Sequence, residues 1–385
     1  MLSVNGRVKM LRRWWHSPTS GSVAPVDDAV DAEHESVSPG VREMACRLNN
    51  DATNFDAAAD NLHRTAQIKM SGEQLRLIVL ADGRAVQQAQ QAGAIAPAFQ
   101  AADCNVEPEN PQSATRIYTG CDGVMVPLVT DAEKKKRRQK VREKRAASTK
   151  PLRPLAPRRP GADLAFKEFK TIVFYDEHGE HWHEVLSRCG RLKAGARLRR
   201  EADRLGFARA DERIANVDGA SWIRRQLVEQ PKQLPLDGLG LDFYHLSENV
   251  HKARRKVFGE DDAEGKTWAA ELLHTLKHDG YDAAWERCVA WRAALRGVKK
   301  RKAADRLLNY MAERRDMIQY PEFAARGWQI GSGPTESRCK TSTSRLKGRG
   351  RRWNAANAEA VDALTTLKDS GQWNLYWPTP SPTTT

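Results

Sequence analysis

The stretch IGSGPTES, from Ile330 to Ser337, places one carboxylate directly after a Gly-Ser-Gly-Pro turn. Proline suits the first turn of a helix, because the N–H that it lacks would have no helical partner there. The pattern therefore predicts a helix that begins at Pro334 and carries Glu336 in its first turn. A basic run, SRLKGRGRRWN, follows a few residues later.

The chain is long and strongly basic. It has 385 residues, with 63 Lys and Arg against 49 Asp and Glu, a net charge of +14 and a pI near 9.6. This length predicts two or three domains with their own cores. The charge favours nucleic acid as a partner, because Lys and Arg displace counterions from phosphates. The alternative is a solvated basic surface with no such partner.

Cysteine usage and hydropathy indicate the cell interior. Six cysteines are scattered without a C-x-x-C pair, which argues against a zinc site and favours reduced thiols. No apolar run of about 18 residues occurs, and the N-terminal segment lacks the apolar core of a secretory signal. We expect a cytoplasmic protein, nucleoid-associated when bound to DNA, without a membrane partner.

The composition and periodicity of the first 110 residues change at about residue 40. Residues 1–40 begin with a basic and aromatic segment, continue as a stretch rich in Pro, Ser and acidic residues, and predict a poorly ordered leader. Residues 41–110 show helical periodicity and predict a small N-terminal domain with a possible role in binding end DNA. Within it, Ser71 to Gly93 reads as two helices around an Asp82-Gly83 turn. This pattern is typical of a helix-turn-helix that reads DNA or of an ordinary helical hairpin.

Residues 111–245 alternate between strand and helix patterns. Strands are predicted at 115–127, at 168–177 and 181–189 as a hairpin, at 212–219 and at 238–245, with helices at 194–207 and 221–230. This order predicts an α/β fold with a mixed sheet. Residues 131–160 form a basic insert, helical at first and then broken by proline.

The remaining chain is predicted to be helical. Residues 246–325 form an all-α insertion, in which Trp268, Trp285 and Trp291 recur at helical positions and are interpreted as core anchors. Residues 326–377 return to the α/β core with the helix that carries Glu336. Residues 378–385 are a low-complexity tail, predicted to be disordered.

Three carboxylates occupy special positions in this order. Asp122 is expected near the end of the first strand, Asp218 at a strand end and Glu336 at a helix start. Side chains at strand ends and on a facing helix can converge, and three carboxylates suit Mg²⁺ or Mn²⁺. Two such ions can activate the attacking oxygen and stabilise the leaving oxygen of a phosphodiester. The alternative is that Asp122-Gly123 and Asp218-Gly219 are simple turns.

Five ordered motifs carry a family resemblance. They are IYTGCDGVMVP, NVDGASWI, LDFYHLSENVH, YPEFAARGWQIGSGPTES and RLKGRGRRWNAANAEA. Together, over residues 42 to 377, the sequence resembles the bacterial insertion-sequence transposases of the ISKra family. These are DDE transposases with an RNase H-like fold, related to the Mutator and hAT groups. The resemblance implies an RNase H-like core interrupted by the all-α insertion, which can help hold transposon-end DNA.

The resemblance implies that Asp122, Asp218 and Glu336 are the catalytic residues and metal ligands. The same groups have a motif of Cys or Asp, two further residues and then His, and Asp242-Phe243-Tyr244-His245 fits it. Asp242 is therefore the alternative second ligand, and His245 a residue near the site. Two Mg²⁺ or Mn²⁺ ions are expected as cofactors.

Two basic segments are expected to contact DNA backbone, since phosphate contacts position DNA without reading its sequence. The residues are Lys134, Lys135, Lys136, Arg137 and Arg138 in the first segment, and Arg345, Lys347, Arg349, Arg351 and Arg352 in the second. A solvated charged face is the alternative. The expected partners are double-stranded DNA, as transposon ends and target, and further copies of the chain in a homodimer or larger assembly.

The activity implied by the resemblance is two-metal phosphoryl transfer. Water cleaves at the transposon end to free a 3′-OH, which then attacks target DNA. Two other functions remain open from the sequence: an RNase H-like nuclease or resolvase that joins nothing, and an inactive, domesticated relative that only binds DNA.

Overall fold

The structure is a computed structural model that describes residues 1–9, 13–19, 21–23, 37–148, 153–228 and 233–378. The chain divides into two compact units. The sheet unit consists of Pro97–Gly123 and Lys170–Lys340, and the helical unit of Met1–Ala96, Val124–Phe169 and Thr341–Thr385. The two units are described separately below.

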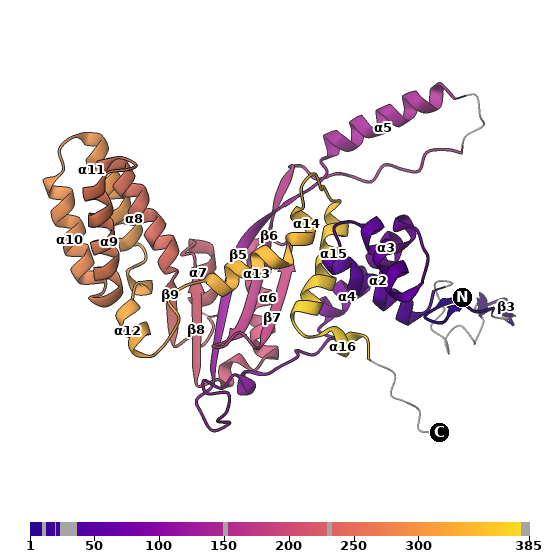
Figure 1. Cartoon of the computed structure of the whole chain (residues 1–385), viewed down its shortest axis with the longest axis horizontal. Coiled ribbons are helices and arrows are strands. Elements are labelled where there is room, and N and C mark those ends of the chain that lie inside the picture. The colour runs from indigo at the N-terminus through magenta and orange to yellow at the C-terminus, as the bar shows by residue number, and fades with distance from the viewer. Residues whose placement is uncertain (10–12, 20, 24–36, 149–152, 229–232, 379–385) are drawn as a thin grey trace. The chain divides into compact units, whose positions relative to one another are not determined.

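A five-stranded mixed sheet forms the centre of the sheet unit, in the order β7-β6-β5-β8-β9 (Figure 1). The strands are β5 (Arg116–Pro127), β6 (Phe166–Asp176), β7 (Trp182–Ser187), β8 (Glu212–Val217) and β9 (Gly238–Leu241). β6 and β7 pair antiparallel, whereas β5, β8 and β9 run parallel. The α/β class, the hairpin and each predicted strand are thus confirmed, except that the last strand ends at Leu241 instead of residue 245.

Successive side chains along β5 and β6 point to opposite faces of the sheet, and both faces are buried, as expected for strands covered on two sides. Ile117 of β5 joins the larger core with Ile172 and Phe174 of β6. Its neighbour Tyr118 joins a second cluster on the other face with Val173 and Tyr175. Helices α6 (Arg191–Arg204) and α7 (Ser221–Val228) contribute to the larger core, and α12 (Tyr320–Ala325) contributes Phe323 to the second cluster.

The predicted all-α region is confirmed, although its first helix starts three residues earlier than expected. The helices between β9 and α12 are α8 (Phe243–Phe258), α9 (Ala263–His278), α10 (Tyr281–Ala294) and α11 (Val298–Ala312). Trp268 and Trp291 stack with ring centroids 4.0 Å apart and pack with Trp285 against the buried core. These tryptophans are therefore packing residues, as the sequence indicated.

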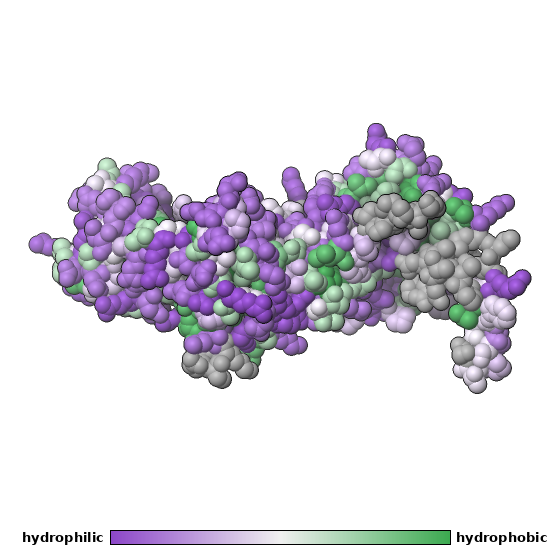
Figure 2. All heavy atoms as spheres, turned by 90° about the horizontal axis from the view of Figure 1, so that it is seen from below, coloured by the Kyte–Doolittle hydropathy of each residue, from purple (hydrophilic) through white to green (hydrophobic). Residues whose placement is uncertain are grey.

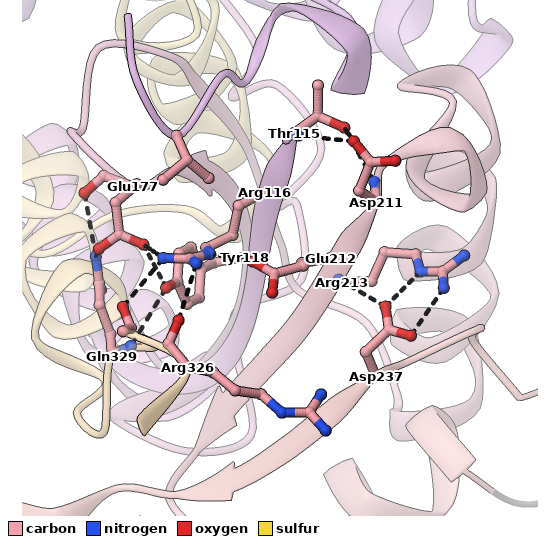
Figure 3. Close-up of polar contacts among 12 residues, drawn as sticks. Thr115, Arg116, Tyr118, Glu177, Asp211, Glu212, Arg213, Asp237, Arg326 and Gln329 are labelled. Carbon is pink, nitrogen blue, oxygen red and sulfur yellow. Dashed lines mark hydrogen bonds and ion pairs between the residues drawn. The ribbon is translucent and has the colours of Figure 1, made fainter. Parts of the chain in front are cut away.

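After α12 the chain returns to the sheet through Arg326 to Gln329, and a polar network holds this segment (Figure 3). Arg116 of β5 donates to the carbonyl oxygens of Arg326 and Gly327, each at 3.0 Å. The same guanidinium pairs with Glu177 at 2.8 Å and Glu212 at 2.6 Å. A second set of bonds runs from Gln329 N to Tyr118 Oη at 3.2 Å and from Tyr118 Oη to Glu177 at 2.6 Å.

The helical unit packs α15 (Ala355–Asp369) against α4 (Gly72–Ala92), with α2 (Pro39–Asp51) and α3 (Phe55–Ala66) beside α4. The predicted Asp82-Gly83 turn is wrong, because α4 is continuous through both residues. Gly83 is instead a crossing point, where an added Cβ would lie 2.2 Å from the Ala360 carbonyl oxygen. Asp82 is buried and pairs with Arg42 of α2. Neither a helix-turn-helix nor a hairpin is present at this position.

Other boundaries of the helical unit also differ from the prediction. Residues from Thr341 on, including α14 (Ser344–Lys347), α15 and α16 (Trp373–Tyr376), group with the N-terminal helices and not with the α/β core. The basic insert is helical in α5 (Asp131–Ala146), as predicted. Helix α13 (Gly333–Ser342) begins one residue before the predicted start.

The leader contains more structure than the sequence suggested. Two short antiparallel hairpins pair β1 (Leu2–Ser3) with β2 (Gly6–Arg7) and β3 (Trp15–Ser17) with β4 (Gly21–Val23). Residues 24–36 of the leader and 379–385 of the tail lie outside the described residues. In the described part of the chain, no helix has both the length and the apolar character to cross a bilayer. Hydrophilic side chains predominate on the face shown in Figure 2.

We predict that Arg116→Met lowers the free energy of unfolding by about 2–3 kcal/mol, because it leaves two partly buried carboxylates without their cation. Urea denaturation measures this. Arg213→Met is the matched control: Arg213 pairs with Asp237 through two N–H groups at 2.8 and 2.9 Å at a more exposed position. This control should cost below about 1 kcal/mol. Equal losses in both variants would contradict a special role for the Arg116 network.

Candidate functional site

The segment IGSG is fastened to the start of α8. Ile330 O accepts a hydrogen bond from Phe243 N at 3.0 Å. Asp242, which is fully buried, accepts the Ser332 N–H with Oδ2 and the His245 N–H with Oδ1, the latter at 2.7 Å. Asp242 is therefore the N-cap of α8 and at the same time the anchor of the turn before α13.

This fastening brings three ionisable side chains together. One ligand atom from each of Asp242, His245 and Glu336 lies within 4.8 Å of the others. Glu336 Oε1 is 3.9 Å from His245 Nε2 and 3.3 Å from Ser332 Oγ, whose hydroxyl donates to it. The Glu336 side chain is half exposed, so one side of the cluster is open to solvent.

The start of α13 also packs closely on β5. An ideal Cβ on Gly120 would lie 1.9 Å from Oγ1 of the buried Thr335, so only glycine allows this approach. Asp122 follows Gly120 by two residues and therefore points to the same face of the strand. Cys339 lies one helical turn after Glu336. Burial is the main cause that raises its pKa to about 12, and the negative charge of Asp122 also raises it.

Asp218 lies in the turn between β8 and α7. Its Oδ1 accepts the Ala220 N–H at 2.8 Å, and Gly219 has a φ of +77°, which favours glycine. Burial raises the pKa of Asp218, whereas the hydrogen bond from Ala220 N–H lowers it. The negative charge of Asp122 raises this pKa further, and the positive charges of His245 and Arg314 lower it. Asp218 therefore interacts electrostatically with both Asp122 and His245.

The two turn interpretations have different outcomes. At Asp218-Gly219 a turn is present, as the alternative held. At Asp122-Gly123 there is no turn, because β5 continues to Pro127. Asp122 therefore lies in the interior of its strand. The expectation that it lies near the strand end was wrong.

The expected ligand set and the observed cluster share only Glu336. Among the described residues, the one group of three or more possible ligands this close together contains Asp242 and His245, not Asp122 and Asp218. Carboxylate oxygens suit Mg²⁺ or Mn²⁺, whereas an imidazole favours other metals. The oxygen-rich set Asp122, Asp218 and Glu336 therefore fits the expected cation by chemistry, and the set with His245 fits it less well.

The basic residues expected to contact DNA all belong to the helical unit. No residue of α5 is buried, so Lys135, Lys136 and Arg137 are available to solvent. Lys347 and Arg349 are exposed as well. Arg345 differs, since it is only 4% exposed and donates to Asn49 and Thr53. Its side chain is almost fully buried and is not on an exposed surface, unlike Lys347 and Arg349.

Several positioning residues were not found from the sequence. Ser332, Thr335 and Gly120 act through contacts between segments distant in the chain. Arg314 donates to the Gly219 carbonyl oxygen at 3.1 Å, from the end of the helical insertion. Three other histidines that are close in the chain, His178, His181 and His183, have three different partners: Val106 O, the Phe99 ring and Glu201.

Comparison of the chain with models of protein families and with curated proteins finds no match.

We predict opposite stability effects for the two candidate second acids. Asp218→Asn should raise the unfolding midpoint at pH 7–8, because a carboxyl with a raised folded-state pKa disfavours the fold once it is ionised. This gain should vanish as the pH falls below about 4, where Asp is protonated in the unfolded chain too. Asp242→Asn should lower the free energy of unfolding by about 1–3 kcal/mol. The side-chain NH₂ group of Asn is a donor, and it would face one of the two backbone N–H groups, of Ser332 or His245, that the carboxylate accepts. Thermal unfolding across pH measures both, and a stable Asp242→Asn variant would contradict the anchoring role.

We predict that Gly120→Ala destabilises the protein by about 1–3 kcal/mol, because the new methyl overlaps Thr335. Thr335→Ala removes the overlapping hydroxyl, so the double variant Gly120→Ala with Thr335→Ala should regain most of the loss. Equilibrium denaturation of the two single variants and the double variant gives the interaction free energy between residues 120 and 335. Additive effects would show that the two residues are not in contact.

Proposed function

We propose that this chain is a DNA transposase of the ISKra kind, with an RNase H-like core, that cleaves transposon ends and joins them to target DNA. The observation that carries the proposal is that the helix bearing Glu336 packs against β5 at Gly120, two residues before Asp122. Glu336 on α13 lies beside Asp242 and His245, and Asp218 interacts with both Asp122 and His245. The mixed sheet, and the helical block inserted before α13, support the same proposal.

In this proposal Asp122, Asp218 and Glu336 hold two Mg²⁺ or Mn²⁺ ions. When bound, such ions polarise the scissile phosphodiester and lower the pKa of an attacking water. Asp122 is fixed by the central strand, and Asp218 by its turn with Ala220. Burial raises the pKa of Asp218, and the negative charge of Asp122 raises it further, an unfavourable interaction that a bound cation would offset.

Asp242 and His245 have a positioning role in this proposal. Both carboxylate oxygens of Asp242 already accept backbone N–H groups, and the residue is fully buried. It therefore fixes where α13 starts. His245, 3.9 Å from Glu336, adds positive charge near the carboxylates when protonated and helps to orient Glu336.

The proposal predicts DNA cleavage and joining that depend on Mg²⁺ or Mn²⁺. DNA that carries the candidate terminal inverted repeats from either side of the gene is the substrate, and free 3′-OH ends and joined strands are scored on denaturing gels. Glu336→Gln, Asp122→Asn and Asp218→Asn should each lower both products by more than about 100-fold, because partners outside the ligand shell alone are worth about 10–100-fold. DNA affinity should change little.

Glu248→Gln is the matched control, because Glu248 is an exposed carboxylate on α8 that pairs with Lys252. It should cleave and join like the wild type. Cleavage without joining would favour a nuclease or resolvase instead, and binding without cleavage an inactive relative. Full activity in Glu336→Gln would overturn the proposal.

A further inference from the structure

The helical unit contains a pocket of about 420 Å³ that the site above does not use. This is within the usual range of ligand pockets. It is bordered by the start of α3, the middle of α4, the start of α5 and the segment between α14 and α15. The lining residues that matter here are Phe55, Leu80, Val129, Arg345, Arg351 and Trp353.

One side of the pocket is apolar and rigidly held. Trp353 donates its backbone N–H to Pro127 O at 3.1 Å and accepts from Val129 N at 2.8 Å. Its indole N–H donates to Leu346 O at 3.0 Å. The Phe55 ring packs edge-on against the indole, with centroids 6.1 Å apart. The two rings are thus fixed before any ligand arrives.

A buried cation lies at the same side. The Arg345 guanidinium is 5.0 Å from the Phe55 centroid and 5.4 Å from the Trp353 centroid. Its hydrogen bonds reach only neutral oxygens, those of Asn49 and Thr53. Within the described residues, no carboxylate pairs with this 4% exposed side chain. Burial of a charge without a counter-ion is costly and therefore points to an anionic ligand.

The rest of the lining strengthens the positive charge. Six of its residues are Lys or Arg, and the described lining contains no Asp or Glu. Arg351 turns back to donate to Arg345 O at 2.7 Å, so the cations lie close together. Arg352 pairs with Glu133 at 2.7 Å and is the better neutralised of the two neighbours.

A ligand for this pocket needs a flat apolar face and a negative charge next to each other. Intact duplex DNA offers phosphates, but its base faces are stacked inside. An unpaired nucleotide offers both, and stacking of bases on aromatic side chains is the common means of binding single strands. We propose that the pocket binds one unpaired nucleotide of a DNA strand, with the base against Phe55 and Trp353 and the phosphate at Arg345 and Arg351.

This inference rests on the proposed function only in taking DNA as the polymer. Three fluorescent duplexes of equal charge test it on the full chain by anisotropy. One has a two-nucleotide 3′ overhang, one has the same overhang with abasic sugars, and one is blunt. The overhang should bind about 10-fold more tightly than the other two, the order expected for stacking of a base.

Variants locate the effect. Phe55→Ala should abolish the preference for the normal over the abasic overhang, and Arg351→Ala should weaken binding of the overhang most. Arg349→Ala is the matched control, because Arg349 is an exposed arginine of the same segment that does not line the pocket. It should reduce binding of all three duplexes equally. Unfolding midpoints establish whether the variants are folded. If Phe55→Ala does not fold, Phe55→Leu replaces it, because Leu keeps an apolar side chain but has no ring.

Three results would overturn the inference. One is equal binding of the three duplexes by the wild type, and another is an unchanged preference in both Phe55 variants. The third is tighter binding of the same overhang made of RNA, which would assign the pocket to RNA. Glu248→Gln should bind all three duplexes like the wild type, and because anisotropy scores binding alone, a failure to cleave DNA leaves this test intact.

Discussion

The return of the chain from the helical insertion to the sheet is the constraint on which the candidate site depends. Residues 242–332, about ninety in number, separate the end of β9 from the start of α13. Loop closure over that length is entropically costly, and hydrogen bonds at two places hold the closed arrangement. Arg116 and Tyr118 hold residues 326–329, and Asp242 holds Ser332.

The consequence is a fixed starting point for α13. Glu336 lies in the first turn of that helix, where its position follows from the turn before it. The absence of a side chain at Gly120 lets Thr335 approach β5 closely. The Asp122 strand and the Glu336 helix are thereby brought together. Burial raises the pKa of Asp218, and the negative charge of Asp122 adds to that rise. Shifted pKa values are common at functional sites, where local charge is arranged for a ligand and not for stability.

Much of the fold followed from the sequence, because its signals are local. Strand alternation, the hairpin at 168–189 and the helical periodicity after residue 246 depend on neighbours within one element. The interpretation of Asp82-Gly83 failed, because Asp-Gly signals a turn only where no tertiary contact uses the glycine. Here Gly83 lets α15 cross α4, and Asp82 pairs with Arg42. The double role of Asp242 was equally hidden, since its second partner is 90 residues away in the chain.

In the proposed function, Asp122, Asp218 and Glu336 form a site for a hard divalent cation. Electron paramagnetic resonance of Mn²⁺ added to the full chain tests this, because it reports free and bound Mn²⁺ without requiring catalysis. We predict saturable binding by the wild type that weakens by more than about 10-fold in both Asp218→Asn and Glu336→Gln. Undiminished Mn²⁺ binding in these two variants would contradict the claim.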